Sequence, residues 1–257
     1  MGNRLVDNTA IVTGAAQGMG LVIANALYAE GARLAIADIN EQGVEEAVET
    51  LDHKRDRAIG AAVDVTEKVQ VVNFVETIYN AWGTVDILVN NAGGALHTPH
   101  RLDEIEETHW DLVMNVNLKG AFLFCQAVIP IMAKQGGGSI VNISALAAHW
   151  RASLAGVQYT AAKAGLEGLT RQLAYDWGKQ GIRVNAVAPT VTITGDRVRG
   201  LWDDKSPQEQ QQVLSAIPLG RLSTPEEIAS VVVFLASSEA SYVTGITVDV
   251  SGGRYLR

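Results

Sequence analysis

Two side chains four residues apart could carry out acid–base chemistry. Tyr159 and Lys163 stand in QYTAAKAG, within a helical pattern predicted over Gln158–Gly178. That spacing places both on one face of a helix. A tyrosine hydroxyl has an ordinary pKa of about 10, so by itself it is a poor base at neutral pH. A neighbouring ammonium favours the tyrosinate and lowers that pKa. The pair therefore predicts a phenol that exchanges a proton with an alcohol or carbonyl oxygen.

A glycine-rich turn upstream could bind a dinucleotide. The segment TGAAQGMG follows a predicted strand and opens a helix predicted over Gly18–Glu30. Gly14 permits a tight turn, Gly18 lets the backbone approach a phosphate, and Gly20 allows close packing of helix and strand. The helix N-terminus then faces the pyrophosphate. The spacing is G-x-x-x-G-x-G rather than G-x-G-x-x-G, so a structural turn without a ligand is the alternative.

Two carboxylates follow the next two predicted strands. Asp38 ends the second strand, about 20 residues after the turn, where an acidic residue binds a ribose 2′-hydroxyl. Its charge would repel a 2′-phosphate, which favours NAD over NADP. The side chain could also cap the following helix. Asp64 ends the third strand and could meet the adenine amino group, although a capping role for the next helix is nearly as consistent with its position.

The elements that must position these groups alternate along the chain. Short β-branched runs alternate with longer helical patterns, which is typical of a parallel sheet with helices on both faces. We expect one α/β domain over residues 1–257. The predicted strands are 9–13, 33–37, 58–63, 86–90, 139–143, 183–188 and 246–250. The predicted helices are 18–30, 41–51, 67–82, 105–134, 158–178 and 225–236.

The segment 190–222 departs from this alternation. It is long, polar and punctuated by glycine, and it follows the carboxyl end of a predicted strand. Ligands bind at that end of open parallel sheets, so we expect a substrate loop or lid. A solvated surface insertion is the alternative.

Composition excludes some classes of partner. The formal charge of −8 argues against nucleic acid or an anionic membrane as a partner. The one cysteine, Cys125, allows no intrachain disulfide and lies in an apolar stretch, so we expect a buried thiol. The five histidines lack metal-site spacing, and no metal is expected. With no apolar signal segment before the first strand, cytoplasmic localisation is expected.

Read in order, the motifs resemble the short-chain dehydrogenase/reductase family over essentially the whole chain. They are TGAAQGMG, Asp38, NNAG at Asn90–Gly93, MNVNLKG, the Tyr159–Lys163 pair and IRVNAVAPT. The resemblance implies a single Rossmann-like, doubly wound domain with about seven parallel strands. It also implies a nicotinamide cofactor without metal, and a homotetramer or homodimer. Transferred by motif, Asn117, Tyr159 and Lys163 are the catalytic positions, and Asn117 would anchor a water on a proton-relay path.

The same resemblance and the turn geometry assign the cofactor site. Thr194 would face the carboxamide, and Pro189 begins the segment after the sixth strand. Lys163 would also bind the ribose hydroxyls. The full predicted set is Gly14, Gln17, Gly18, Met19, Gly20, Asp38, Ile39, Asp64, Val65, Asn91, Ala92, Gly93, Tyr159, Lys163, Pro189, Thr192 and Thr194.

One position departs from the family pattern. Where the family has a serine that binds the substrate oxygen, this chain has Ala145, and Ser144 stands one residue early. Successive strand side chains point to opposite faces, so Ser144 should not simply replace it. Three interpretations remain open. Another donor, such as His149 or Gln158, takes the role; the strand bulges so that Ser144 serves; or Ala145 is an introduced, inactivating substitution.

The substrate is a small alcohol or carbonyl compound in every enzymatic interpretation. The expected pocket segments, 94–97, 145–155 and 190–202, offer amphipathic rings and polar groups without a cluster of arginines, which favours a sugar, polyol or small cyclic alcohol. A 3-oxoacyl-thioester reductase is the alternative activity, and Asp38 counts against it. A non-catalytic NAD-binding protein is the alternative class. The candidate substrate contacts are His97, His149, Trp150, Gln158 and Trp202.

Overall fold

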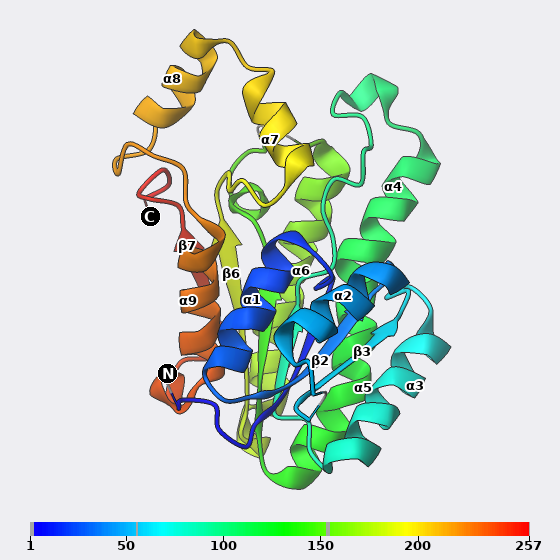
Figure 1. The fold of residues 1–257 in the computed structure, drawn as a ribbon. Helices are drawn as coiled ribbons and strands as arrows, with labels where there is room; N and C mark the ends of the chain where they lie inside the picture. The colour runs from blue at the N-terminus through cyan, green and yellow to red at the C-terminus, as the bar shows by residue number, and fades with distance from the viewer. Residues whose placement is uncertain (1–2, 55, 153–154, 257) are drawn as a thin grey trace.

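Seven parallel strands form a single twisted sheet in the computed structural model, which describes residues 3–54, 56–152 and 155–256 (Figure 1). The spatial order is β3-β2-β1-β4-β5-β6-β7. The predicted doubly wound α/β architecture is confirmed. The strands are β1 (Thr9–Thr13), β2 (Arg33–Asp38), β3 (Ala58–Ala62), β4 (Ile87–Asn90), β5 (Gly138–Ile143), β6 (Ile182–Pro189) and β7 (Thr247–Val250).

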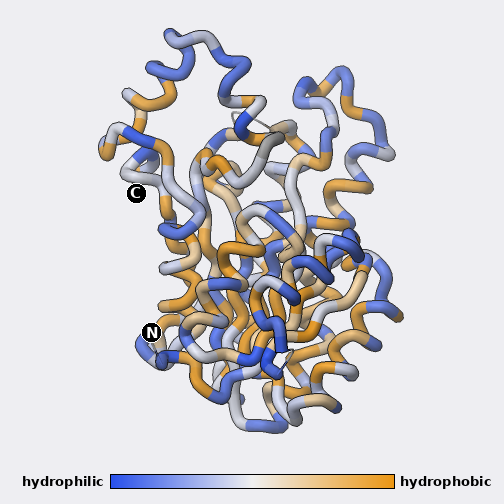
Figure 2. Tube along the Cα trace, viewed as in Figure 1, coloured by the Kyte–Doolittle hydropathy of each residue, from blue (hydrophilic) through white to orange (hydrophobic). Residues whose placement is uncertain are grey.

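Helices cover both faces of this sheet, because successive side chains of each strand are apolar and point alternately to either face. In β1, Ala10 and Val12 pack into one core and Ile11 into the other. The first core takes side chains from α1 (Gly18–Ala29), α2 (Glu41–Leu51) and α9 (Pro225–Ala236). The second takes them from α3 (Lys68–Trp82), α5 (Gly120–Gln135) and α6 (Val157–Trp177). Figure 2 shows hydrophobic residues concentrated in the sheet and on the helix faces that meet it.

The strand order reverses between β1 and β4, which are hydrogen-bonded neighbours. The connections leave these two strands in opposite directions across the sheet, so a crevice opens at their carboxyl ends. The glycine turn after β1 and the NNAG segment after β4 meet at this point. The topology therefore brings together the two motifs predicted to hold a dinucleotide.

The helix predicted over 105–134 is interrupted. The structure has α4 (Glu107–Met114), a π-helical turn (Asn115–Lys119) and then α5. The Asn117 side chain binds the Val113 carbonyl at 2.9 Å and the backbone of Gly94, so this side chain pins the widened turn. Such π turns frequently mark functional sites.

The α4–α5 stretch is apolar enough to cross a membrane by length and hydropathy alone. It spans Glu107–Gln135 and contains an 18-residue window with a mean hydropathy of 1.5. Half of that window is buried within the protein, and α5 contributes Phe124 and Val128 to the second core. These contacts identify it as a core helix of this fold.

The segment 190–222 folds largely as two short helices, α7 (Asp196–Asp203) and α8 (Pro207–Ser215). The Ser206 hydroxyl caps α8 by accepting from the Glu209 N–H, and the Glu209 carboxylate accepts from the Ser206 N–H at 2.8 Å. Both helices project beyond the carboxyl ends of the strands, opposite the α4 side of the crevice (Figure 1). In the part of the chain that the structure describes, short 3-10 turns lie at Leu102–Glu104, Leu146–Ala148, Gly178–Gln180 and Ser238–Ala240.

Candidate active site

The glycine turn is closed so tightly that its three glycine positions accept no side chain. A Cβ on Gly14 would lie 2.7 Å from the Ala92 Cα, and one on Gly20 would collide with the Gly14 carbonyl. Gly18 has a φ of +58°, and a Cβ there would lie 2.8 Å from the Thr194 carbonyl oxygen. Bare backbone at the start of α1 is what a pyrophosphate needs for close approach. The turn therefore fits a dinucleotide, with Gln17 and Met19 contributing backbone beside it.

Asn91 braces this turn against β4. Its side-chain nitrogen donates to the carbonyls of Thr13 at 3.0 Å and Gly14 at 2.8 Å. The N–H groups of Asn91 and Ala92 both donate to the Thr13 hydroxyl at 3.0 Å. A Cβ on Gly93 would collide with the Asn117 side-chain oxygen. The NNAG segment thus fixes the crevice wall through the Asn91 side chain and two backbone N–H groups.

Asp38 stands beside the glycine turn. Its two oxygens accept from the Ala16 N–H at 3.0 Å and the Asn40 N–H at 3.1 Å. The helix cap suggested for Asp38 is supplied by Asn40 instead, whose side chain accepts from the Gly43 N–H. The carboxylate therefore reinforces the turn rather than the helix. Ile39, the next residue, is exposed.

Asp64 closes a local turn onto Thr66, shortly after β3. One carboxylate oxygen accepts from both the N–H and the hydroxyl of Thr66, each at 2.8 Å. The capping role suggested for Asp64 is not observed, because the N-cap residue of α3 is Glu67 and Asp64 instead accepts within a local turn. Val65 is buried, and a Cβ added to Gly120 would lie 2.7 Å from a Val65 methyl carbon, so this segment packs against the start of α5.

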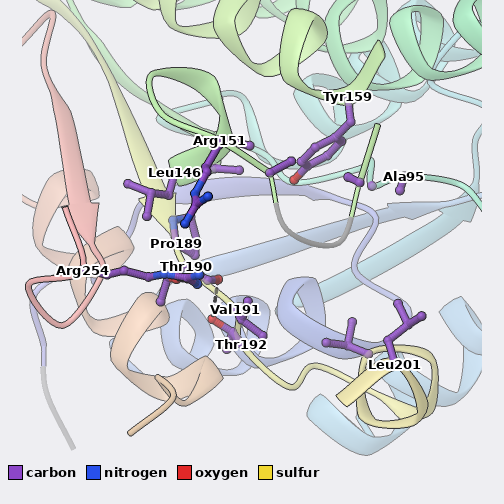
Figure 3. Close-up of a pocket in the computed structure, with 16 residues that line it drawn as sticks. Ala95, Leu146, Arg151, Tyr159, Pro189, Thr190, Val191, Thr192, Leu201 and Arg254 are labelled. Carbon is purple, nitrogen blue, oxygen red and sulfur yellow. Dashed lines mark hydrogen bonds between the residues drawn. The ribbon is translucent and has the colours of Figure 1, made fainter. Parts of the chain in front are cut away.

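Tyr159 and Lys163 occupy the first turns of α6. The Tyr159 hydroxyl points into a cavity (Figure 3). The Lys163 side chain is buried, its ammonium donates to the Ile143 carbonyl at 2.7 Å, and it lies 5.7 Å from the centre of the Tyr159 ring. Burial lowers the pKa of Lys163 to about 8. The structure thus brings the predicted pair together, with the Lys163 ammonium close to the Tyr159 ring.

Asn117 uses its whole amide on the protein backbone. Its nitrogen donates to the carbonyls of Gly94 at 3.0 Å and Val113 at 2.9 Å, and its oxygen accepts from the Gly94 N–H at 2.9 Å. Gly93 and Gly94 both have positive φ, 150° and 134°. Asn117 therefore holds this pair of glycines in a positive-φ conformation that other residues rarely adopt.

The alternation of β5 continues through its end. Ala145 is extended, with φ −160° and ψ 154°, and lines the cavity. Ser144 faces the other way, is buried, and donates to a Glu167 carboxylate oxygen at 3.0 Å. The interpretation in which a bulge presents Ser144 to the substrate is wrong, because no extra residue shifts the register. The cavity wall at the family's serine position is a methyl group.

The cavity has a volume of about 180 Å³ and a mostly aliphatic wall. Thr192, predicted to bind the cofactor, also lines this cavity. Its hydroxyl oxygen lies 2.6 Å from the Ser223 hydroxyl oxygen. Residues 153–154 of the expected lining lie outside the described residues. The described lining is Gly94, Ala95, Ala145, Leu146, Ala147, Arg151, Ala152, Ala155, Tyr159, Pro189, Thr190, Val191, Thr192, Val198, Leu201 and Arg254.

Two predicted substrate residues are instead structural anchors, with Gln158 buried and His149 partly buried. The Gln158 amide donates to the Thr98 hydroxyl at 2.8 Å and the Pro99 carbonyl at 3.0 Å, so it fastens α6 to the segment after β4. His149 lies between Glu167, at 3.0 Å from Nδ1, and Asp249, at 2.9 Å from Nε2. Both side chains are committed to other partners. Neither serves as the donor proposed to compensate for Ala145.

The remaining three predicted substrate residues also lie outside the cavity wall. His97 is exposed, with a positive φ of 58°. On α7, Val198 and Leu201 face the cavity, which turns Trp202 to a different side of the helix. Trp150 stacks instead against Arg151 and Arg254. The sequence pattern overestimated the aromatic character of this pocket because it did not show which way each side chain turns.

Two arginines in the cavity wall correct the expectation of a pocket without a cluster of arginines. Arg151 follows the 3-10 turn after β5, and Arg254 lies near the C-terminus, past β7. Figure 3 shows the two side chains extending from these separate segments toward one another. They are far apart in the sequence and in no recognised motif, so only the packing of β5, β6 and β7 could bring them together. Among the described residues, no group of three or more His, Cys, Asp or Glu could hold a metal ion.

Comparison with known proteins finds similarity along nearly the whole chain. A family model described as enoyl-(acyl carrier protein) reductase matches residues 14–254. A subunit of (2S)-[(R)-hydroxy(phenyl)methyl]succinyl-CoA dehydrogenase from Thauera aromatica is 39% identical over 250 residues, covering 97% of each chain. D-threitol dehydrogenase from Mycolicibacterium smegmatis is 38% identical, covering 99% of this chain and 95% of the other. A 7α-hydroxysteroid dehydrogenase solved with NADH and 7-oxo glycochenodeoxycholic acid superposes with a TM-score of 0.89 at 33% identity, covering 99% of this chain and 97% of the other.

Proposed function

The chain belongs to the short-chain dehydrogenase/reductase family, and from that membership we propose that it transfers hydride between NAD and a small secondary alcohol or its carbonyl form. The observation that carries this proposal is the Tyr159 hydroxyl in the cavity, with the Lys163 ammonium 5.7 Å from its ring centre. The predicted glycine turn and the predicted acid–base pair thus lie at one end of one sheet.

Tyr159 is the proposed acid–base group. In oxidation its deprotonated oxygen takes the proton of the substrate hydroxyl, and in reduction it returns a proton to the carbonyl oxygen. The buried Lys163 ammonium favours the tyrosinate by charge attraction. Ile143 holds that ammonium in place through its carbonyl, 2.7 Å from Nζ.

The residues around the glycine turn fit a nicotinamide dinucleotide. Gly14, Gly18 and Gly20 leave backbone where a Cβ would fill the cradle, and the N-terminus of α1 opens toward it. When bound, the nicotinamide ring supplies or accepts the hydride. The chain's own contribution is to hold the pyrophosphate at α1 and to place Lys163 and Thr194 near the crevice. The proposed role of Asn117 is to hold the backbone of Gly93 and Gly94 at the crevice, beside the proton-relay path.

We propose NAD rather than NADP because Asp38 places a carboxylate at the end of β2. A 2′-phosphate at that position would meet a negative charge, whereas a ribose hydroxyl could donate to it. Asp38 already accepts two backbone N–H groups, which hold the carboxylate oxygens beside the turn.

The proposed substrate is a small hydroxylated molecule, such as a sugar derivative, polyol or cyclic alcohol. The cavity volume of about 180 Å³ suits a molecule of this size, and a threitol dehydrogenase is among the relatives. A 3-oxoacyl-thioester reductase is the second candidate, because another relative acts on a CoA ester. We propose residues 190–222 as the lid over this cavity, because Val198 and Leu201 on α7 form part of its wall.

Replacing Tyr159 by phenylalanine tests the proposed function. We expect alcohol-dependent NADH formation to fall at least about 10³-fold, while NADH binding measured by fluorescence changes less than about threefold. The matched control is Tyr79→Phe on α3, which should leave both unchanged. If no alcohol or carbonyl panel member supports turnover by the unaltered protein, and NADH still binds, the chain is a non-catalytic NAD-binding protein.

A further inference from the structure

Two positive charges share one wall of the proposed substrate cavity. Arg151 and Arg254 both line it. Among the side chains that the structure describes, neither guanidinium has a carboxylate within ion-pair distance. Arg151 is exposed and Arg254 is partly buried, so solvent screens part of their charge, and an anion bound between them would offset their mutual repulsion.

Arg254 is held in place while part of its guanidinium stays unsatisfied. One terminal nitrogen donates to the Thr190 hydroxyl at 3.2 Å. Its Nε is buried and has no hydrogen-bond partner among the described residues. Burial, and then the nearby positive charge of Arg151, lower the pKa of Arg254. Each effect disfavours the charged form in the absence of a ligand, so an anion placed between the two arginines would relieve both.

Trp150 positions the two guanidinium groups. Its ring lies 5.1 Å from the Arg151 Cζ and 5.5 Å from the Arg254 Cζ. Tyr255 packs on the same ring at a centroid distance of 6.2 Å. Stacking on an aromatic face restricts a guanidinium to a plane and leaves its edge free to donate two parallel hydrogen bonds. Such a fork matches the geometry of an oxyanion.

We propose that Arg151 and Arg254 bind an anionic group of the substrate, so that the molecule oxidised or reduced at Tyr159 is a small hydroxy acid or oxo acid. The group is an oxyanion of the carboxylate, sulfonate or phosphate class. This inference rests on the proposed function, because it places the acid group at one end of the cavity and the reacting carbinol at Tyr159 (Figure 3). It also narrows the substrate from any polyol or cyclic alcohol to one that carries a negative charge.

The experiment compares charged and neutral alcohols of matched length. Initial rates with NAD are measured for 3-hydroxybutanoate against 2-butanol, and for 2-hydroxypropanesulfonate and glycerol 1-phosphate as the other anionic arms. We expect at least one anionic probe to exceed 2-butanol in kcat/KM by about 100-fold, and its identity assigns the oxyanion class. Arg254→Gln and Arg151→Gln should each lower that value about 10- to 100-fold and leave 2-butanol within about threefold. Arg171→Gln, an exposed site on α6, is the control.

A binding measurement separates this inference from the proposed function. The unreactive acids butanoate, propanesulfonate and inorganic phosphate are titrated while the unfolding temperature is followed without turnover. If one of these acids raises the unfolding temperature, and Arg151→Gln or Arg254→Gln removes that rise, the arginine site is supported. This holds even if no alcohol is oxidised. The absence of oxidation would contradict only the proposed function. The arginine site would be overturned if 2-butanol were oxidised as fast as every anionic probe and both variants had the same ratio of anionic to neutral kcat/KM as the unaltered protein. Hydride transfer itself would still be supported.

Discussion

The methyl group of Ala145 is the most consequential single side chain in the cavity wall. It occupies the position at which the family places a serine, and the serine before it is committed to Glu167. The described residues of the wall offer the hydroxyls of Tyr159, Thr190 and Thr192. Thr190 accepts from Arg254 and keeps its own O–H as a donor, and Thr192 is paired with Ser223.

If Ala145 is an inactivating substitution, Ala145→Ser adds a donor to the substrate oxygen at the position where the family has its serine. We expect kcat to rise by about 10²- to 10³-fold, the usual loss when such a donor is removed. Steady-state rates with the best alcohol of a panel provide the measurement, and Ala147→Ser, also in the wall, is the control. An unchanged kcat would show that Ala145 is not an inactivating substitution and that the site works without this donor.

Lys163 makes stability depend on pH in a defined direction. Burial lowers its pKa from the ordinary value near 10.5 to about 8, so the unfolded chain binds its proton more tightly than the folded one. The cost of burying the charge is present below pH 8 and is relieved as the pH rises from 8 to 10.5.

Comparison with Lys163→Met isolates this effect, because other titrating groups cancel. We expect the free energy of unfolding of the unaltered protein, relative to that of the variant, to rise by about 3 kcal/mol between about pH 7.5 and 10.5. Urea unfolding without cofactor at several pH values measures it. A difference between the two proteins that stays constant with pH would contradict the assignment.

At the scale of single elements, the end of β2 sets the proposed cofactor preference. Asp38 is the last residue of the strand and is fixed by the N–H groups of Ala16 and Asn40. Asp38→Ala should lower kcat/KM for NAD by about 10-fold and raise it for NADP, because it removes both an acceptor and a repulsive charge. Rates with each cofactor test this, with Asp64→Ala as comparison. An unchanged NAD to NADP ratio would remove Asp38 from the ribose site.

A buried polar chain links β5, α6 and the end of β7. Ser144 donates to Glu167, which pairs with His149, and His149 lies 2.9 Å from Asp249. Tyr159, Lys163 and Glu167 follow one another at intervals of four on α6, so this chain anchors the same helix face that carries the proposed catalytic pair. The loop bearing Trp150 and Arg151 begins at His149, so the chain also fixes one side of the cavity.

Glu167→Leu should leave Ser144 and His149 without their partner in a buried site. We expect a loss of about 2 to 4 kcal/mol in the free energy of unfolding, with a smaller loss for Glu167→Gln. Urea denaturation measures both, and Glu226→Gln, in the first turn of α9, is the control. A loss below about 0.5 kcal/mol for the leucine variant would show that the chain contributes little.

For the whole molecule, an apolar groove on α4, the π-helical turn, α5 and α6 bears on the homodimer or homotetramer that the family resemblance implies. Met114, Leu118 and Leu169 line a hollow beside Phe122, whose side chain is 45% exposed. Such a surface is what a second copy would cover. Phe122→Glu should shift the mass measured by light scattering toward the monomer. Val69→Glu, at an exposed apolar site on α3, should not. A monomeric unaltered protein would exclude the assembly.

Much of this protein was determined by its sequence alone. The apolar runs are buried on both faces, so they could only be parallel strands between two helical layers, and helices such as Glu41–Leu51 and Pro225–Ala236 match their predicted bounds. The glycine turn and the pair on α6 are local patterns, since a strained turn demands glycine and an i, i+4 spacing fixes a common face.

Only the tertiary structure decided what lines the cavity. Whether His149 faces a substrate or two carboxylates depends on α6 and β7, which the local sequence around it does not contain. The π turn at Asn117 is tied to another segment, because the Asn117 side-chain oxygen accepts from the Gly94 N–H. Arg151 and Arg254 meet because three adjacent parallel strands bring their ends together, a consequence of long-range pairing that no local pattern encodes.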